Sequence, residues 1–258
     1  MSRNIDSQSL CGLLRRARIS NKSLQISFKD GMLWQQRPIL PRLQICDQLD
    51  ASLKSLLENT QEWHRWKLRD KTILAVVLAH TVMHCSEGPW LHAELNKEHI
   101  FFFRKSCAQP PDLSRPFLAI DFAQQNIVAN EEDDMFPIHS NPFLLSLGIV
   151  LLEINRGILI EDYWSQKDLT NGLIPNDSTN LTAALRLLED MDGHLVNGSQ
   201  KAVKACLQWD NMNYGREHED FAKRMYELVV KPLEEVLLSG FNITPEQLGL
   251  TERQNHRG

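Results

Sequence analysis

The sequence contains no long apolar run and no closely spaced pair of cysteines. A membrane-spanning helix needs about 20 consecutive, predominantly apolar residues, and no segment approaches that length. No apolar signal segment opens the chain either, so we expect a cytoplasmic protein. An odd number of widely scattered cysteines, without a Cys-x-x-Cys motif, favours reduced thiols over a disulfide framework. The five cysteines are Cys11, Cys46, Cys85, Cys107 and Cys206.

Catalytic motifs are also scarce. No Gly-x-Ser-x-Gly elbow occurs, so no hydrolase nucleophile is apparent. Only Gly12 and Gly31 fall in the first fifty residues, and they are too far apart to form a glycine-rich loop that approaches nucleotide phosphates. We find no internal repeat and no long low-complexity segment. The sequence is thus that of an ordinary globular chain without a recognisable phosphate-binding loop.

Two pairs of histidines have spacings that could hold a metal ion. His80 and His84 are four residues apart, as in a zinc-binding helix, but Thr81 occupies the position of the catalytic Glu. His92 and His99 flank one loop. Histidines with structural hydrogen bonds explain both pairs more simply, and we expect neither a metal nor a cofactor.

Composition and charge indicate a folded protein without a nucleic-acid partner. Of the 258 residues, 42% are hydrophobic and 24% charged, so one large domain or two small ones can bury a core. The formal net charge is -5, which argues against general nucleic-acid binding. Residues 1–45 carry eight Lys or Arg and two Asp, or +6, which leaves -11 for the remainder. A short amphipathic helix at 9–18 in this basic segment favours docking on the protein, and binding to anionic lipid is the alternative.

Hydrophobic patterning predicts a mainly helical chain with a small β part. We expect a hairpin from Leu24–Phe28 and Met32–Trp34, then strands at 100–103 and 117–122. Helices should begin near Asp50 or Ser52 and near Asp70, and Gly88-Pro89 should end the second. Leu144–Ile154 is apolar nearly all round, which is typical of a helix buried by its neighbours. Further helices are predicted at 179–191, 199–208 and 217–238, the last interrupted by Pro232.

Four segments resemble parts of a protein kinase. Trp90–Phe103 resembles the catalytic loop and the short strand after it, and Ser146–Gly157 resembles the buried central helix of the C-lobe. Leu43–Leu49 resembles the hinge, and Leu78–His84 resembles the end of the helix before the catalytic loop. More narrowly, the chain is similar over residues 43–238 to a fungal kinase-like family, domain of unknown function 7580. The matching pieces include Pro89-Trp90-Leu91, Ile100–Phe103, Ile138–Pro142 running into Leu147–Glu153, and Tyr226–Glu234.

The resemblance implies a kinase C-lobe with a reduced N-terminal lobe, divided into residues 1–45 and 46–258. It also implies a degenerate site, because the kinase base Asp is Glu94, the preceding Arg is Ala93 and the metal-binding Asn is His99. A misplacement of about 1 Å can cost on the order of 100-fold in rate, and His is a poor Mg²⁺ ligand. Neither His92, Glu94 nor His99 is therefore expected to be catalytic. Asp121, in Asp121-Phe122-Ala123, is the remaining candidate for holding a metal.

We therefore expect a pseudokinase-like interaction or regulatory domain with a protein partner, in fungal signalling of the incompatibility or immune type. The partner surface is expected at the loop of residues 94–99 or at the acidic run Glu131–Asp134. One alternative is a degenerate ATP-dependent phosphotransferase with Glu94 as base and Asp121 as metal ligand. The other is an anionic-lipid-binding module, and membrane association is the less favoured reading.

Overall fold

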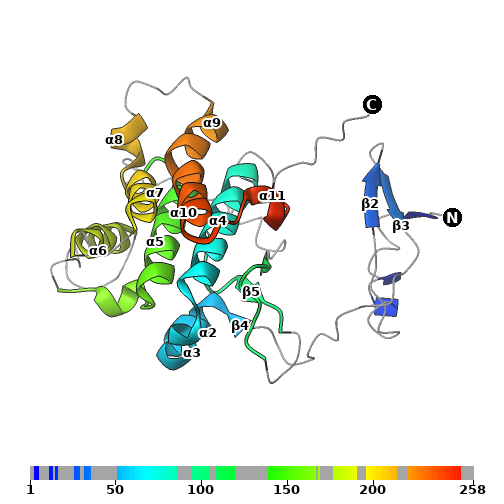
Figure 1. Cartoon of the computed structure of the whole chain (residues 1–258), viewed down its shortest axis with the longest axis horizontal. Helices are drawn as coiled ribbons and strands as arrows, with labels where there is room; N and C mark the ends of the chain where they lie inside the picture. Colours follow the sequence, from blue (N-terminus) through cyan, green and yellow to red (C-terminus); the bar gives the residue numbers. More distant parts are fainter. Residues whose placement is uncertain are drawn as a thin grey trace, which may run out of the picture. The chain divides into compact units, whose positions relative to one another are not determined.

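The structure is a computed structural model that falls into two compact units, shown in Figure 1. One unit comprises Met1–Gln48 and Arg104–Gln109, and the other comprises Leu49–Phe103 and Pro110–Gly258. The division of the chain into residues 1–45 and 46–258 stays a prediction. The residues that the structure describes are 3–5, 12–13, 15–16, 26–29, 32–35, 51–85, 95–104, 109–119, 139–166, 168, 177–190, 196–213 and 220–250.

The smaller unit contains a three-stranded antiparallel sheet in the order β1-β3-β2. The strands are β1 (Arg3–Ile5), β2 (Ile26–Lys29) and β3 (Met32–Gln35). In the β2–β3 pair, Lys29 lies opposite Met32 and Phe28 opposite Leu33, so the predicted hairpin is confirmed. Residues 12–13 and 15–16 are helical, inside the segment where the sequence predicts a short helix.

The larger unit is mainly helical, which confirms the predicted helical class with a small β part. Its long helices are α4 (Leu68–Cys85), α5 (Pro142–Arg156), α6 (Asp177–Asp190), α7 (Asn197–Leu207) and α10 (Lys231–Phe241). Shorter turns are α2 (Leu53–Glu58), α3 (Thr60–Arg65), η2 (Ile160–Tyr163), α8 (Trp209–Asn213), α9 (Phe221–Met225), the π-helical η4 (Tyr226–Val230) and α11 (Pro245–Leu248).

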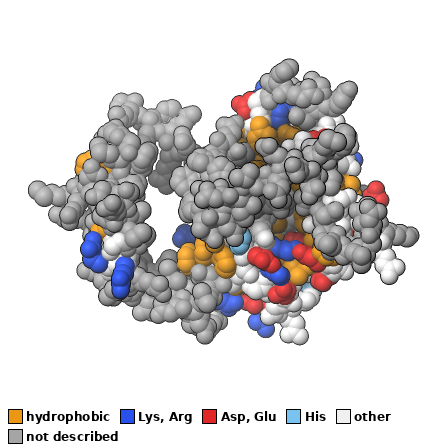
Figure 2. Space-filling model, turned by 180° about the vertical axis from the view of Figure 1, so that it is seen from behind, with side chains coloured by type: hydrophobic (Ala, Val, Ile, Leu, Met, Phe, Trp, Pro, Cys, Tyr) orange, Lys and Arg blue, Asp and Glu red, His pale blue; other side chains and the backbone are white. Residues whose placement is uncertain are grey.

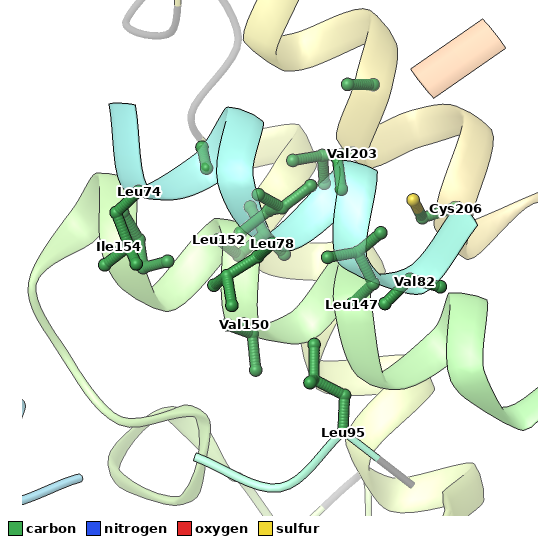
Figure 3. Close-up of a cluster of buried hydrophobic side chains, with 14 of the residues drawn as sticks. Leu74, Leu78, Val82, Leu95, Leu147, Val150, Leu152, Ile154, Val203 and Cys206 are labelled. Carbon is green, nitrogen blue, oxygen red and sulfur yellow. The ribbon is translucent and has the colours of Figure 1, made fainter. Parts of the chain in front are cut away.

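The core of this unit lies where α4, α5, α7 and α10 pack together (Figure 1). In the close-up of Figure 3, the apolar side chains of α4 face those of α5, while Val203 and Cys206 approach from α7. Leu151 on α5 is fully buried, as are most of its neighbours along the helix. The prediction of a buried helix at 144–154 is therefore confirmed, and this helix lies in the core of the larger unit. The labelled residues of Figure 3 are Leu74, Leu78, Val82, Leu95, Leu147, Val150, Leu152, Ile154, Val203 and Cys206.

Helix α5 has well-defined ends and one very close neighbour. The Asn141 side chain caps its start by accepting from the Leu144 N–H at 3.0 Å. Gly157 ends it with φ of 74°, a left-handed conformation that suits glycine. In between, a Cβ atom added to Gly148 would lie 2.9 Å from the Cys206 Cβ, which shows how closely α7 approaches α5. Glycine at position 148 therefore sets the spacing of these two helices.

A second three-stranded antiparallel sheet, in the order β4-β5-β6, belongs to the larger unit. Its strands are β4 (Ala51–Ser52), β5 (Ile100–Phe102) and β6 (Pro116–Leu118). Phe117 stacks between Phe101 and Phe103, with ring centroids 5.6 and 4.4 Å away. The predicted strand at 117–122 is thus shifted, with pairing from Pro116 to Leu118 among the described residues.

Three helix boundaries refine the sequence prediction. Ser52, not Asp50, caps α2, since its side chain accepts from the Ser55 N–H at 3.1 Å. Asp70 does not cap α4, because that helix begins two residues earlier and holds Asp70 in its first turn. The predicted helix at 217–238 is divided into α9, η4 and α10, and the π turn ends just before Pro232. Pro232 has no N–H to donate, which explains the local change of hydrogen bonding.

The surface carries charges of both signs. On the face shown in Figure 2, acidic and basic side chains lie next to one another on the larger unit, beside hydrophobic patches. Among the described residues, no helix combines the length and the hydrophobicity needed to cross a bilayer.

Candidate functional site

The segment that resembles a catalytic loop is described from Leu95 to His99, immediately before β5. Leu95 is buried in the core, and the next described buried side chain is that of Lys97, which is only 8% exposed. Asn96, Glu98 and His99 are exposed. The loop therefore turns an apolar and a cationic side chain inward and presents three polar side chains to solvent.

Lys97 is held by two carboxylates from other elements. Its Nζ lies 2.5 Å from Oε1 of Glu153, which is fully buried on α5, and 2.6 Å from Oε2 of Glu161 in η2. The Ile160 N–H also donates to Glu153 Oε1 at 2.8 Å. These contacts, which we call the Lys97 cluster (Lys97, Glu153 and Glu161), tie the loop to the central helix and to the segment that follows it.

Burial dominates the electrostatics of this cluster. It raises the pKa of the Glu153 carboxyl, and the Lys97 ammonium and the Ile160 N–H offset part of that effect. The second oxygen of Glu153, Oε2, is buried and accepts no hydrogen bond in the described part of the structure. A buried carboxylate is tolerated only when it is paired, so Lys97 is needed where it lies and is not available to bind a phosphate.

The backbone of the loop is fixed on both sides. The Lys54 N–H of α2 donates to the Lys97 carbonyl at 3.2 Å, and the Lys54 ammonium pairs with Glu98 at 2.5 Å. On the other side, the Ala119 N–H after β6 donates to the His99 carbonyl at 2.9 Å. The exposed side chains of the loop therefore project from a backbone that is held in place by hydrogen bonds. The exposed Lys54–Glu98 pair itself adds little to stability.

Of the four kinase-site candidates His92, Glu94, His99 and Asp121, only His99 is described. Its side chain is exposed, and its N–H closes a turn onto the Asn96 carbonyl at 2.9 Å. His92, Glu94 and Asp121 lie outside the described residues, as does the acidic run Glu131–Asp134.

Sequence reasoning did not identify Lys97 and Glu153 as partners. The signal that could have pointed to them is the single acidic residue inside the otherwise apolar stretch Leu144–Ile154. A lone carboxylate on the buried face of a helix requires a cation from another element.

His80 has a structural partner. Its Nε2 lies 2.7 Å from Oε1 of Glu234 on α10, and the Tyr226 hydroxyl donates to the other Glu234 oxygen at 3.2 Å. His80 and His84 stack with ring centroids 5.9 Å apart. Throughout the described ranges, no group of three or more His, Cys, Asp or Glu side chains is placed to hold a metal ion. The His80–Glu234 contact thus joins α4 to α10.

His139 also has a structural role, at the start of α5. Its Nδ1 accepts from the Asn141 N–H at 3.1 Å, so the proton lies on Nε2, which donates to the Cys206 carbonyl at 2.8 Å. The Ser140 N–H donates to the Asp210 carboxylate at 3.2 Å. The segment before α5 is therefore fastened to α7 and α8, and the neutral tautomer of His139 is set by its two backbone partners.

Comparison with known proteins identifies a family but no characterised relative. Residues 2–240 match the family described as Domain of unknown function (DUF7580). No curated protein and no solved structure matches the chain.

Proposed function

We propose that this chain, which belongs to the DUF7580 family, is a non-catalytic, pseudokinase-like interaction or regulatory domain with a protein partner. We further propose that its larger unit corresponds to a kinase C-lobe and that it acts in the cytoplasm of a fungus, in signalling of the incompatibility or immune type. The fungal and signalling context comes from the family resemblance carried by the motifs at Ile100–Phe103 and Leu147–Glu153.

The Lys97 cluster is the observation that carries this proposal. A phosphotransferase needs its loop side chains directed at nucleotide, metal or substrate. Here the cation of the loop is directed inward, to two carboxylates at 2.5 and 2.6 Å, and supports the loop backbone. The outward side chains Asn96, Glu98 and His99 stand on this frame, and exposed loops on a rigid scaffold are the usual place for recognition.

The catalytic arm of the test uses the full chain with ATP and Mg²⁺. We expect no phosphate transfer to the protein or to a generic substrate, and no rise in melting temperature with the nucleotide, since a ligand stabilises only the state it binds. Phosphate transfer that Glu94→Gln abolishes would instead establish the enzymatic alternative.

The interaction arm compares two double variants of equal chemistry. Glu98→Ala/His99→Ala removes exposed side chains of the loop, and Glu58→Ala/His64→Ala removes exposed side chains of α2 and α3. A protein captured from fungal extract by the wild type should be lost with the first variant and kept with the second. Capture that both variants retain would mean that the loop is not the recognition surface.

A further inference from the structure

A cleft of about 360 Å³ lies on the larger unit, away from the Lys97 cluster. Helix α7 forms one wall, η4 and the start of α10 form the other, and Met212 of α8 contributes at one end. Its volume falls within the range of about 300–1,000 Å³ that small-molecule sites occupy. The described residues that line the cleft are Lys201, Lys204, Ala205, Met212, Glu227, Leu228, Lys231, Pro232 and Glu235.

Three lysines converge on this cleft from two helices. Lys201 and Lys204 lie three residues apart on the exposed side of α7, and Lys231 is the first residue of α10. Like charges at this spacing on a helix repel each other. In the described part of the chain, none of the three ammonium groups forms an ion pair with a carboxylate. The three ammonium groups thus have no direct carboxylate contact within the described structure, although the chain as a whole is acidic.

The two carboxylates of the cleft do not balance these cations. Glu227 is already engaged, with Oε2 3.6 Å from Nη1 of Arg224. Glu235 is the second carboxylate, on the exposed side of α10. The cleft thus has three ammonium groups and only one carboxylate, Glu235, that is not already paired with another cation. This excess of positive charge favours an anion.

The remaining lining is apolar. Ala205 and Leu228 lie on opposite walls, and Met212 and Pro232 complete the surface. Methionine is a flexible side chain that adapts to irregular apolar ligands. A cationic rim over an apolar lining matches a molecule with a charged end and a hydrocarbon body better than it matches a fully hydrated ion such as free phosphate.

The wall opposite α7 has an unusual backbone. Residues 226–230 form a π turn, closed by the Lys231 N–H donating to the Tyr226 carbonyl, and Pro232 follows with no N–H of its own. Such π turns occur frequently at functional sites. The two walls meet closely at Gly198, where an added Cβ would lie 2.5 Å from the Pro232 carbonyl oxygen. This contact fixes α7 against α10, so the cleft is pre-formed.

A second cleft shows that these features are not general to the surface. It measures about 280 Å³, and Lys204 borders it too, but its other charged lining residue is Glu189. One ammonium beside one carboxylate gives no preference for an anion. Of these two clefts in the described part of the chain, only the one between α7 and α10 combines an excess of cations with an apolar lining.

We propose that the cleft between α7 and α10 binds a small molecule with one anionic group, a carboxylate or a phosphate monoester, on an apolar body. The anion contacts Lys201, Lys204 and Lys231, and the apolar body lies against Leu228 and Met212. This site is separate from the loop on which the proposed function rests, so either can fail without the other.

The test measures binding of octanoate and octyl phosphate to the full chain by titration calorimetry. Both should bind, octanol and acetate should bind more weakly, and added salt should weaken the two acids because it screens the lysines. The double variant Lys204→Ala/Lys231→Ala should lose about tenfold or more in affinity, as expected when charge-assisted contacts are removed. The matched control Lys67→Ala/Lys223→Ala removes two exposed lysines elsewhere and should bind as the wild type does.

Each other outcome contradicts the proposal. Binding of octanol as tight as that of octanoate would show a purely apolar site, and equal losses in the two double variants would show a non-specific charge effect. Absence of binding by either acid would also overturn it.

Vesicles of phosphatidylcholine with phosphatidic acid distinguish the source of the anion. If the wild type sediments with these vesicles and Lys204→Ala/Lys231→Ala does not, the bound anion is a lipid headgroup. If neither the wild type nor this variant sediments, the bound anion is a free acid.

Discussion

Lys97 and Glu153 form an ion pair between the loop that precedes β5 and the largely buried helix α5. The two atoms, Nζ and Oε1, lie 2.5 Å apart, with the Lys97 side chain 10% exposed and that of Glu153 0% exposed. The pair joins residues 56 positions apart in the sequence. It is thus a tertiary constraint, and its loss should be felt in both elements.

We expect Lys97→Met to lower the free energy of unfolding by about 3–5 kcal/mol, because it leaves the Glu153 carboxylate buried without its cation. The double variant Lys97→Met/Glu153→Leu should recover most of that loss, since apolar side chains of similar volume replace a buried pair at little cost. Urea unfolding at neutral pH measures both values. The control is Lys54→Met, at an exposed pair, and equal midpoints for Lys97→Met and Lys54→Met would contradict the prediction.

Truncation of Leu151, which is fully buried on α5, should cost about 2–5 kcal/mol as Leu151→Ala, through lost transfer energy and the cavity left behind. The same substitution at Leu238, whose side chain is 50% exposed on α10, should cost much less. Thermal or urea unfolding compares the two. Melting of Leu151→Ala within a degree or two of the wild type would place α5 at the periphery.

Two glycines in helices should respond to alanine in opposite directions. Gly148→Ala should destabilise by about 1–3 kcal/mol, since the new methyl would meet Cys206 and Leu207 at 2.9 and 2.8 Å. No atom lies within 4 Å of a Cβ added at Gly240, so Gly240→Ala should stabilise α10 by up to about 1 kcal/mol. Both are read from urea midpoints, and a neutral Gly148→Ala would show that α7 can move away from α5.

Asp168 should give a pH-dependent contribution to stability. Burial alone would raise its pKa, but hydrogen bonds from Ser165 and the Arg186 guanidinium at 2.7 Å together hold it below its ordinary value of 3.8. Because the folded-state pKa is lowered, the ionised carboxylate stabilises the fold at pH values above the ordinary pKa. This stabilisation is lost as the pH falls through the folded-state pKa. Asp168→Asn should therefore destabilise at pH 7, and its difference from the wild type should shrink below pH 3.8. A difference that is constant with pH would exclude the ionised carboxylate as the cause.

Local patterns predicted much of the helical framework. The apolar stretch 144–154 predicted α5, and Ser52 as a cap predicted the start of α2. Both signals are local, because periodicity and capping act over a few residues. Boundaries were less secure, as at Asp70, where the helix extends two residues further toward its start than the acidic residue suggested. Side-chain propensity is too weak to fix a helix end when tertiary packing extends it.

The site could be predicted only in part. The motif comparison identified the loop and singled out His99, which is exposed, but it passed over Lys97, which lies two residues before it. Partners such as Glu153 and Glu161 are far away in the sequence, and no local pattern reports a pair that forms only when the chain folds. The cleft between α7 and α10 was likewise missed, since its lysines look like ordinary solvated positions until the two helices bring them together.

The close packing of α7 on α5 also makes Cys206 a natural reporter of motion. Its thiol is fully buried, and this burial raises its pKa far above the ordinary value and so disfavours the reactive thiolate. Modification of Cys206 by a thiol reagent must wait until these helices part. The rate of that reaction therefore measures how often the centre of the fold opens, with no label added to the chain.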